Sequence, residues 1–146
     1  MNDALLESMP ENIQDLISDF EFLDSWEDRY MHVIDMGKSL PPLEPALKTD
    51  ATKVKGCVSQ VWLVSERSGE ENPVLKFKGD SDAHIVKGLV AVVLEIFSGR
   101  HASEILKLEA RSILEKLGLS EHLSPQRSNG LQAMVARIKA EAESLV

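Results

Sequence analysis

The residue best suited to chemistry in this chain is Cys57, its single cysteine. It follows Gly56 and precedes residues 61–64, a Val-Trp-Leu-Val run of the branched, aromatic and aliphatic side chains that strands prefer. A glycine suits a loop at this point because, without a Cβ, it reaches positive φ at little steric cost. We therefore expect a thiol on a loop that is anchored by the strand behind it.

One thiol limits the chemistry that the chain can do. A zinc site or an iron–sulfur cluster needs several ligands at suitable spacing, and the histidines are dispersed at His32, His84, His101 and His122. Phosphate-binding glycine loops and a GxSxG element are absent from the sequence. A Cys–His hydrolase stays open, because spatial neighbours cannot be read from sequence. A sulfur relay needs only one thiol, and a buried structural cysteine needs no chemistry at all.

The sequence around Cys57 resembles a motif of a known protein family. Residues 56–62 read GCVSQVW and resemble the G-C-x-S-Q-V-W element of the SufE family, the sulfur-acceptor partners of cysteine desulfurases. Residues 79–89 (GDSDAHIVKGL) and 123–131 (LSPQRSNGL) resemble the same family in the same order, as do residues 26–30 (WEDRY). The resemblance runs from about Asp24 to the C-terminus.

This resemblance implies an α+β fold, a small antiparallel sheet flanked by helices, shared with the IscU-type scaffolds. It implies that Cys57 accepts persulfide sulfur from a pyridoxal-phosphate-dependent cysteine desulfurase of the SufS or CsdA type. Turnover of the desulfurase would rise, and the sulfur would pass to a downstream iron–sulfur scaffold complex. The chain would then be a sulfur carrier rather than an enzyme, with no cofactor of its own, since the pyridoxal phosphate belongs to the desulfurase. IscU-type scaffolds carry three cysteines, which disfavours a scaffold role here.

Three further residues are candidates for partner binding. Arg127 matches the arginine of the family's S-P-x-R motif, so the resemblance implies a partner contact or a support for sulfur transfer; the alternative is an ordinary surface charge. Asp82 lies in a matched motif, although helix capping alone would explain it. Gln60 is expected to orient the cysteine loop. Trp62 is expected to serve packing.

Composition adds limits on the class of protein. The 146 residues fit one domain, 1–146, with 24 acidic residues against 16 lysines and arginines and a formal charge of −8. This excess of negative charge argues against a protein that binds nucleic acid. The N-terminus lacks a secretory signal and no apolar run is long enough for a bilayer, so we expect a cytoplasmic protein without a membrane partner. A weak homodimer is left open. A second function is also left open, in which the chain is an interaction module of a desulfurase complex and its cysteine is structural.

Periodicity predicts the elements around the thiol. Ser8 and Glu11 form a capping box for a first helix. Asp24 and Ser25 offer caps for a second helix, which Gly37 is expected to end.

After a proline-containing linker at residues 40–45, residues 53–64 are expected to supply a short strand, the cysteine loop and a longer strand. A further strand is predicted at residues 74–78. Residues 79–82 are expected to close the sheet and start a long core helix, with Ser81 as its cap and Asp82 in its first turn. Ser124 and Pro125 mark the start of the last helix.

The residues around Cys57 are expected to shield its thiol in the free protein. The residues that follow it supply enough apolar surface to cover a small side chain; they are Val58, Val61, Trp62 and Leu63. We expect such a setting to raise the pKa of Cys57, and the thiol to swing outward when a partner docks.

Overall fold

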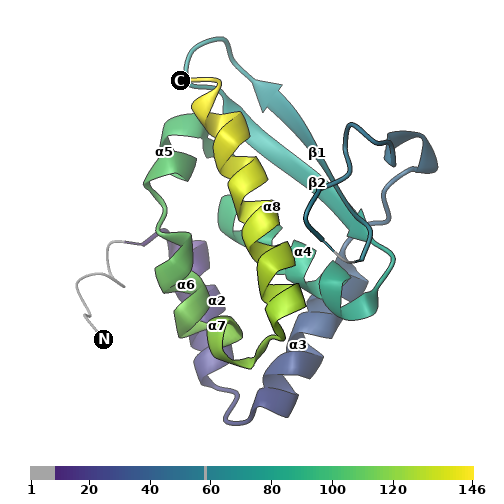
Figure 1. The fold of residues 1–146 in the computed structure, drawn as a ribbon. Coiled ribbons are helices and arrows are strands. Elements are labelled where there is room, and N and C mark those ends of the chain that lie inside the picture. Colours follow the sequence, from purple (N-terminus) through teal and green to yellow (C-terminus); the bar gives the residue numbers. More distant parts are fainter. Residues whose placement is uncertain (1–8, 58) are drawn as a thin grey trace.

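The computed structural model describes residues 9–57 and 59–146, so the predicted role of Ser8 in a capping box lies outside the described residues. Figure 1 shows helices gathered beside one small sheet, with the last helix passing across the core helix α4. The elements are α2 (Glu11–Glu21), α3 (Trp26–Ser39), the 3₁₀ turn η1 (Pro45–Leu47), β1 (Val61–Ser68), β2 (Val74–Ser81), α4 (His84–Phe97), β3 (Arg100–His101), α5 (Ala102–Lys107), α6 (Ala110–Lys116), α7 (Leu119–His122) and α8 (Pro125–Glu143). The predicted α+β class is confirmed.

The sheet has three antiparallel strands in the order β1-β2-β3. Leu75 and Phe77 of β2 are buried while Lys76 and Lys78 are exposed, which is the predicted alternation. The two-residue strand β3 was not predicted, because so short a segment carries no period. A bridge between Lys53 and Trp62 extends the sheet on the far side of β1.

The boundary between β2 and α4 differs from the prediction. The strand continues through Ser81, and Ala83 is the N-cap of the helix, so Asp82 precedes the helix and does not lie in its first turn. Both predicted capping roles were therefore wrong. The polar groups of this segment bond across to the end of the cysteine loop instead, a contact between distant residues that the local pattern does not contain.

Helix α4 forms the centre of the core, with most of its residues buried against α3, α8 and the sheet. Two glycines allow α3 to approach it closely. A Cβ added to Gly37 would lie 2.6 Å from the backbone nitrogen of Gly88, and one added to Gly88 would collide with Val33. Gly37 is thus a packing residue inside α3, which continues to Ser39 and so ends two residues beyond the predicted stop at Gly37, with Lys38 in its last turn.

Two helix starts follow the sequence signals. The hydroxyl of Ser25 accepts the N–H of Asp28 at the start of α3. The hydroxyl of Ser124 accepts the N–H of Arg127, with Pro125 in the first position of α8. This cap fixes the end of α8 that lies nearest the cysteine loop.

Candidate functional site

Cys57 lies on the loop that connects Lys53, which forms a bridge with Trp62, to the start of strand β1 at Val61. The preceding residue, Gly56, has φ +95°, a left-handed conformation that favours glycine. The Cys57 side chain is half-buried, and its Sγ–H points to the carbonyl oxygen of Gly130 in α8 at 3.6 Å. A Cβ added to Gly130 would lie 3.4 Å from this sulfur, so the glycine leaves room for the thiol beside the helix.

The thiol opens onto a cavity of about 380 Å³ between the loop, α4 and the first turns of α8. One part of its lining is apolar and comes from the two helices, while the rest is polar and comes from the loop and the start of α8. The lining residues are Cys57, Ser59, Val86, Leu89, Ser124, Gln126, Arg127, Gly130, Leu131 and Met134. Arg127, a candidate from the sequence, therefore shares one cavity with Cys57.

Burial raises the pKa of the Cys57 thiol, as expected. The apolar lining that accompanies this burial differs from the predicted one. It comes from α4 and α8, and Val61, Trp62 and Leu63 do not line the cavity. Val58 lies outside the described residues. The three described residues belong to β1, where Val61 and Leu63 are buried in the core instead.

The other two candidates, Gln60 and Asp82, meet where the loop joins β1. The carboxylate of Asp82 accepts the backbone N–H of Gln60 at 3.0 Å, and the N–H of Asp82 donates to the Gln60 carbonyl at 3.3 Å. Ser81 also donates its hydroxyl to that carbonyl at 2.7 Å. These bonds fix the backbone three residues after the thiol. The side chains of Gln60 and Asp82 are not part of the cavity lining.

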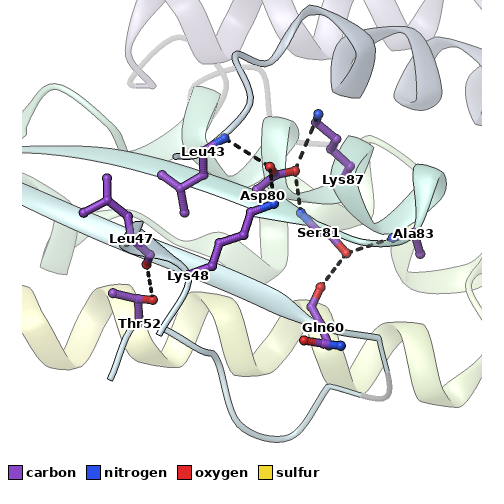
Figure 2. Close-up of polar contacts among 9 residues, drawn as sticks. All are labelled: Leu43, Leu47, Lys48, Thr52, Gln60, Asp80, Ser81, Ala83 and Lys87. Atoms are coloured by element: carbon purple, nitrogen blue, oxygen red, sulfur yellow. Dashed lines mark hydrogen bonds and ion pairs between the residues drawn. The ribbon is translucent and has the colours of Figure 1, made fainter. Parts of the chain in front are cut away.

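Sequence reasoning missed Asp80, a carboxylate that is only 4% exposed. Figure 2 shows its partners: it accepts the N–H groups of Leu43 at 3.1 Å and Ser81 at 2.8 Å, and it pairs with Lys48 at 3.3 Å and Lys87 at 3.5 Å. Burial alone would raise its pKa, but the two N–H groups and the two lysines outweigh burial, and the pKa of Asp80 lies below its usual value.

The alternating pattern of β2 predicts an exposed position for Asp80. Alternation along β2 places it with the exposed Lys76 and Lys78, on the face that should be wet. It is buried because the segment predicted as a plain linker folds over this end of the sheet, where Leu43 is buried and Lys48 lies over the ring of Trp62. No local signal predicts that cover.

Residues 9–57 and 59–146 contain neither a cluster of metal-ligating side chains nor a helix suited to a membrane. No group of three or more His, Cys, Asp or Glu side chains there is arranged to hold a metal ion. Within the same ranges no helix is both long and apolar enough to cross a membrane.

Comparison with known proteins gives concordant results. The family model SufE, described as an Fe-S metabolism associated domain, matches residues 14–142. An uncharacterized SufE-like protein of Rhizobium meliloti (strain 1021) is 56% identical over 133 residues, which cover 90% of this chain and 95% of that protein. Another from Rhizobium etli is 57% identical over 133 residues, covering 90% of each.

A solved structure agrees on the fold. The solution structure of a hypothetical protein from Thermus thermophilus superimposes with a TM-score of 0.74 at 19% identity, covering 94% of this chain and 97% of that one. At this identity the likeness concerns the fold alone.

Proposed function

Since the chain belongs to the SufE family of iron–sulfur metabolism, with a role in sulfur transfer, we propose that Cys57 accepts persulfide sulfur from a cysteine desulfurase. The observation that carries this proposal is the position of the chain's single thiol. It lies on a loop at the wall of an open cavity that Arg127 also lines, and its side chain is only half-buried. A thiol placed there can meet a reacting group supplied by another protein.

The transfer is a sulfur exchange between two cysteine side chains, one in each protein. The thiolate of Cys57 attacks the terminal sulfur of the desulfurase persulfide, the sulfur–sulfur bond breaks, and the desulfurase cysteine leaves as thiolate. Cys57 then carries the added sulfur as a persulfide. Removal of the persulfide frees the desulfurase for another turnover, which is how the chain would stimulate it.

The surrounding residues fit support roles. Arg127 is exposed at the start of α8 and lines the same cavity, so its charge can steady an anionic sulfur or contact the desulfurase. Asp82 holds the backbone of Gln60 and so fixes the far end of the loop. In this scheme the chain is a carrier rather than an enzyme.

The proposal assigns no resident cofactor to the chain. The pyridoxal phosphate that releases sulfur from cysteine belongs to the desulfurase, of the SufS or CsdA type, and the downstream acceptor is the iron–sulfur scaffold complex. The cytoplasm is the compartment that suits such a carrier, because a lone thiol stays reduced there.

Intact-mass measurement tests the proposal. The protein is incubated with a pyridoxal-phosphate-dependent cysteine desulfurase and free cysteine, and the adduct is read before and after reduction. We expect a one-sulfur adduct that dithiothreitol removes, and no adduct on Cys57→Ser. A wild-type chain that gains no sulfur while the desulfurase turns over would defeat the proposal.

The half-burial of Cys57 and its raised pKa favour a second function, an interaction module with a structural cysteine. The same experiment separates the two. A module would stimulate the desulfurase equally well as Cys57→Ser, and no sulfur would reach the chain. A carrier loses stimulation together with the adduct.

A further inference from the structure

The segment that leads into the cysteine loop is held by a residue that the reaction does not use. Arg137, in α8, donates from one guanidinium nitrogen to the carbonyl of Lys53 at 2.8 Å and from the other to the carbonyl of Ala51 at 2.6 Å. Its side chain is 26% exposed, and the two carbonyls that it holds belong to exposed residues. The planar fork of an arginine suits two neighbouring acceptors, which a lysine cannot match.

The carbonyls held by Arg137 belong to a short extension of the sheet. The N–H of Val54 donates to Val61 at 2.8 Å, and the N–H of Leu63 donates to Thr52 at 2.9 Å. Before them, the Thr52 hydroxyl donates to the carbonyl of Leu47 at 2.6 Å, which closes a turn (Figure 2). Arg137 thus joins α8 to a segment that is already paired with β1, three residues before the loop glycine.

The same face of α8 follows the loop up to the thiol. Gly130, Ala133 and Arg137 are spaced three and four residues apart, so they lie on one face of the helix. Gly130 meets Cys57, a Cβ on Gly56 would lie 3.4 Å from Ala133, and Arg137 holds Lys53. The loop and the helix therefore run side by side in opposite directions, with Arg137 at one end of the contact and the thiol at the other.

We propose that Arg137 is a positioning residue that sets the placement of Cys57 against α8. Its two hydrogen bonds fix where the loop starts, and the bonds of Asp82 and Ser81 to Gln60 fix where it ends. The residues between these two points keep the thiol at the cavity wall. The inference rests on the proposed function, because it concerns the group that would carry sulfur.

Alkylation of Cys57 by iodoacetamide tests this placement without any desulfurase. The variant Arg137→Met keeps an unbranched apolar stem but has no donors. We expect its native-state alkylation to be about tenfold faster. A tenfold change corresponds to the free energy of roughly one charge-assisted hydrogen bond, which no longer holds the loop closed in the variant. Unfolding in urea is measured beside it, so that a change in global stability is seen separately.

Two variants sharpen the test. Arg137→Lys retains a donor for one carbonyl and should recover part of the slow alkylation. An alkylation rate equal to that of Arg137→Met would show that a donor at this position does not set the rate, and would overturn the proposal. Lys139→Met removes donors from the same helix at a different place, since Lys139 holds the carbonyls of Ile105 and Leu108. An equal acceleration in Lys139→Met would also overturn it, because any loosening of α8 would then suffice.

Sulfur loading gives a second readout. With a desulfurase and cysteine, Arg137→Met should load more slowly at saturating desulfurase, while the half-saturating concentration stays within about twofold. A change in half-saturation alone would make Arg137 a partner contact and refute the positioning role. If wild type loads sulfur but Arg137→Met reacts and loads unchanged, only this inference fails. If Arg137→Met is alkylated faster but wild type never loads sulfur, only the proposed function fails.

Discussion

Asp80 and Cys57 both lose water when the chain folds, yet their ionisation shifts in opposite directions. The carboxylate has two N–H donors and two lysines around it, and its pKa falls. The thiol has one neutral partner, the Gly130 carbonyl, and its pKa rises. Burial disfavours both charged forms, so the partners decide the outcome. The fold pairs the charge of Asp80 with two lysines of the same chain, whereas the Cys57 anion has no charged hydrogen-bond partner among the described residues.

The comparison predicts that stability depends on Asp80. Asp80→Asn should lower the free energy of unfolding by about 3 kcal/mol, because removing one partner of a buried ion pair leaves the others uncompensated. Lys48 and Lys87 are 31% and 24% exposed and can regain some water, which keeps the loss at the low end. Urea unfolding followed by tryptophan fluorescence measures it. Asp82→Asn is the matched control on an exposed carboxylate and should cost under about 1 kcal/mol.

The same carboxylate predicts an acid dependence. A lowered pKa means that the unfolded chain binds more protons between the folded and unfolded values, so stability rises with pH in that window. The contribution of Asp80 is full above its unfolded pKa of about 3.9 and disappears as the pH falls through the folded value. The stability gap between wild type and Asp80→Asn should therefore narrow on acidification. A gap that stays constant into strong acid would contradict it.

At Cys57, we expect a substitution in the neighbouring helix to raise the stability of the protein and at the same time to slow alkylation of the thiol. Gly130→Ala replaces a poor helix former within α8 and should add about 0.5–1 kcal/mol. The new methyl would lie 3.4 Å from Sγ and 3.8 Å from Cβ of Cys57, at ordinary contact distance, so alkylation should slow.

The exposed Ala136 provides the control on the same helix. Ala136→Gly should cost about 1 kcal/mol and leave alkylation unchanged. A loss of stability in Gly130→Ala would show that the loop packs against α8 more tightly than these distances allow.

Much of the fold could be predicted because its signals are local. Ser25 and Ser124 cap helices as expected, and the alternation around Leu75 and Phe77 gives β2. Cys57 and Arg127 could be singled out by resemblance, and the structure brings them to one cavity.

The missed features depend on distant contacts. Asp80 is buried by a segment 37 residues away along the chain, and Arg137 holds carbonyls 84 and 86 residues away. Gly37 reads as a stop signal until α4 is packed against it. Strand β3 exists only through its pairing with β2.

Replacing the thiol itself should change stability least. Cys57→Ser is nearly isosteric, the side chain is half-buried, and its hydrogen bond to Gly130 is long, so we expect a change under about 1 kcal/mol in the free energy of unfolding. Urea unfolding beside Asp80→Asn makes the contrast direct. A loss as large as that of Asp80→Asn would mean that Cys57 is a structural residue, as the interaction-module alternative requires.

The smallest effect concerns the titration of Cys57. Since burial raises its pKa and no charged side chain is hydrogen-bonded to it among the described residues, the thiolate fraction at neutral pH should be below that of a free thiol. The rate of iodoacetamide alkylation against pH should therefore have its midpoint above about 8.5, the value for a free cysteine, and this shift should vanish in urea. Adding a desulfurase that lacks its own active-site cysteine should move the midpoint downward if the partner supplies the missing positive charge. A midpoint in the free native protein at or below that of the urea-unfolded chain would show that Cys57 is already activated, and the contrast with Asp80 would fail.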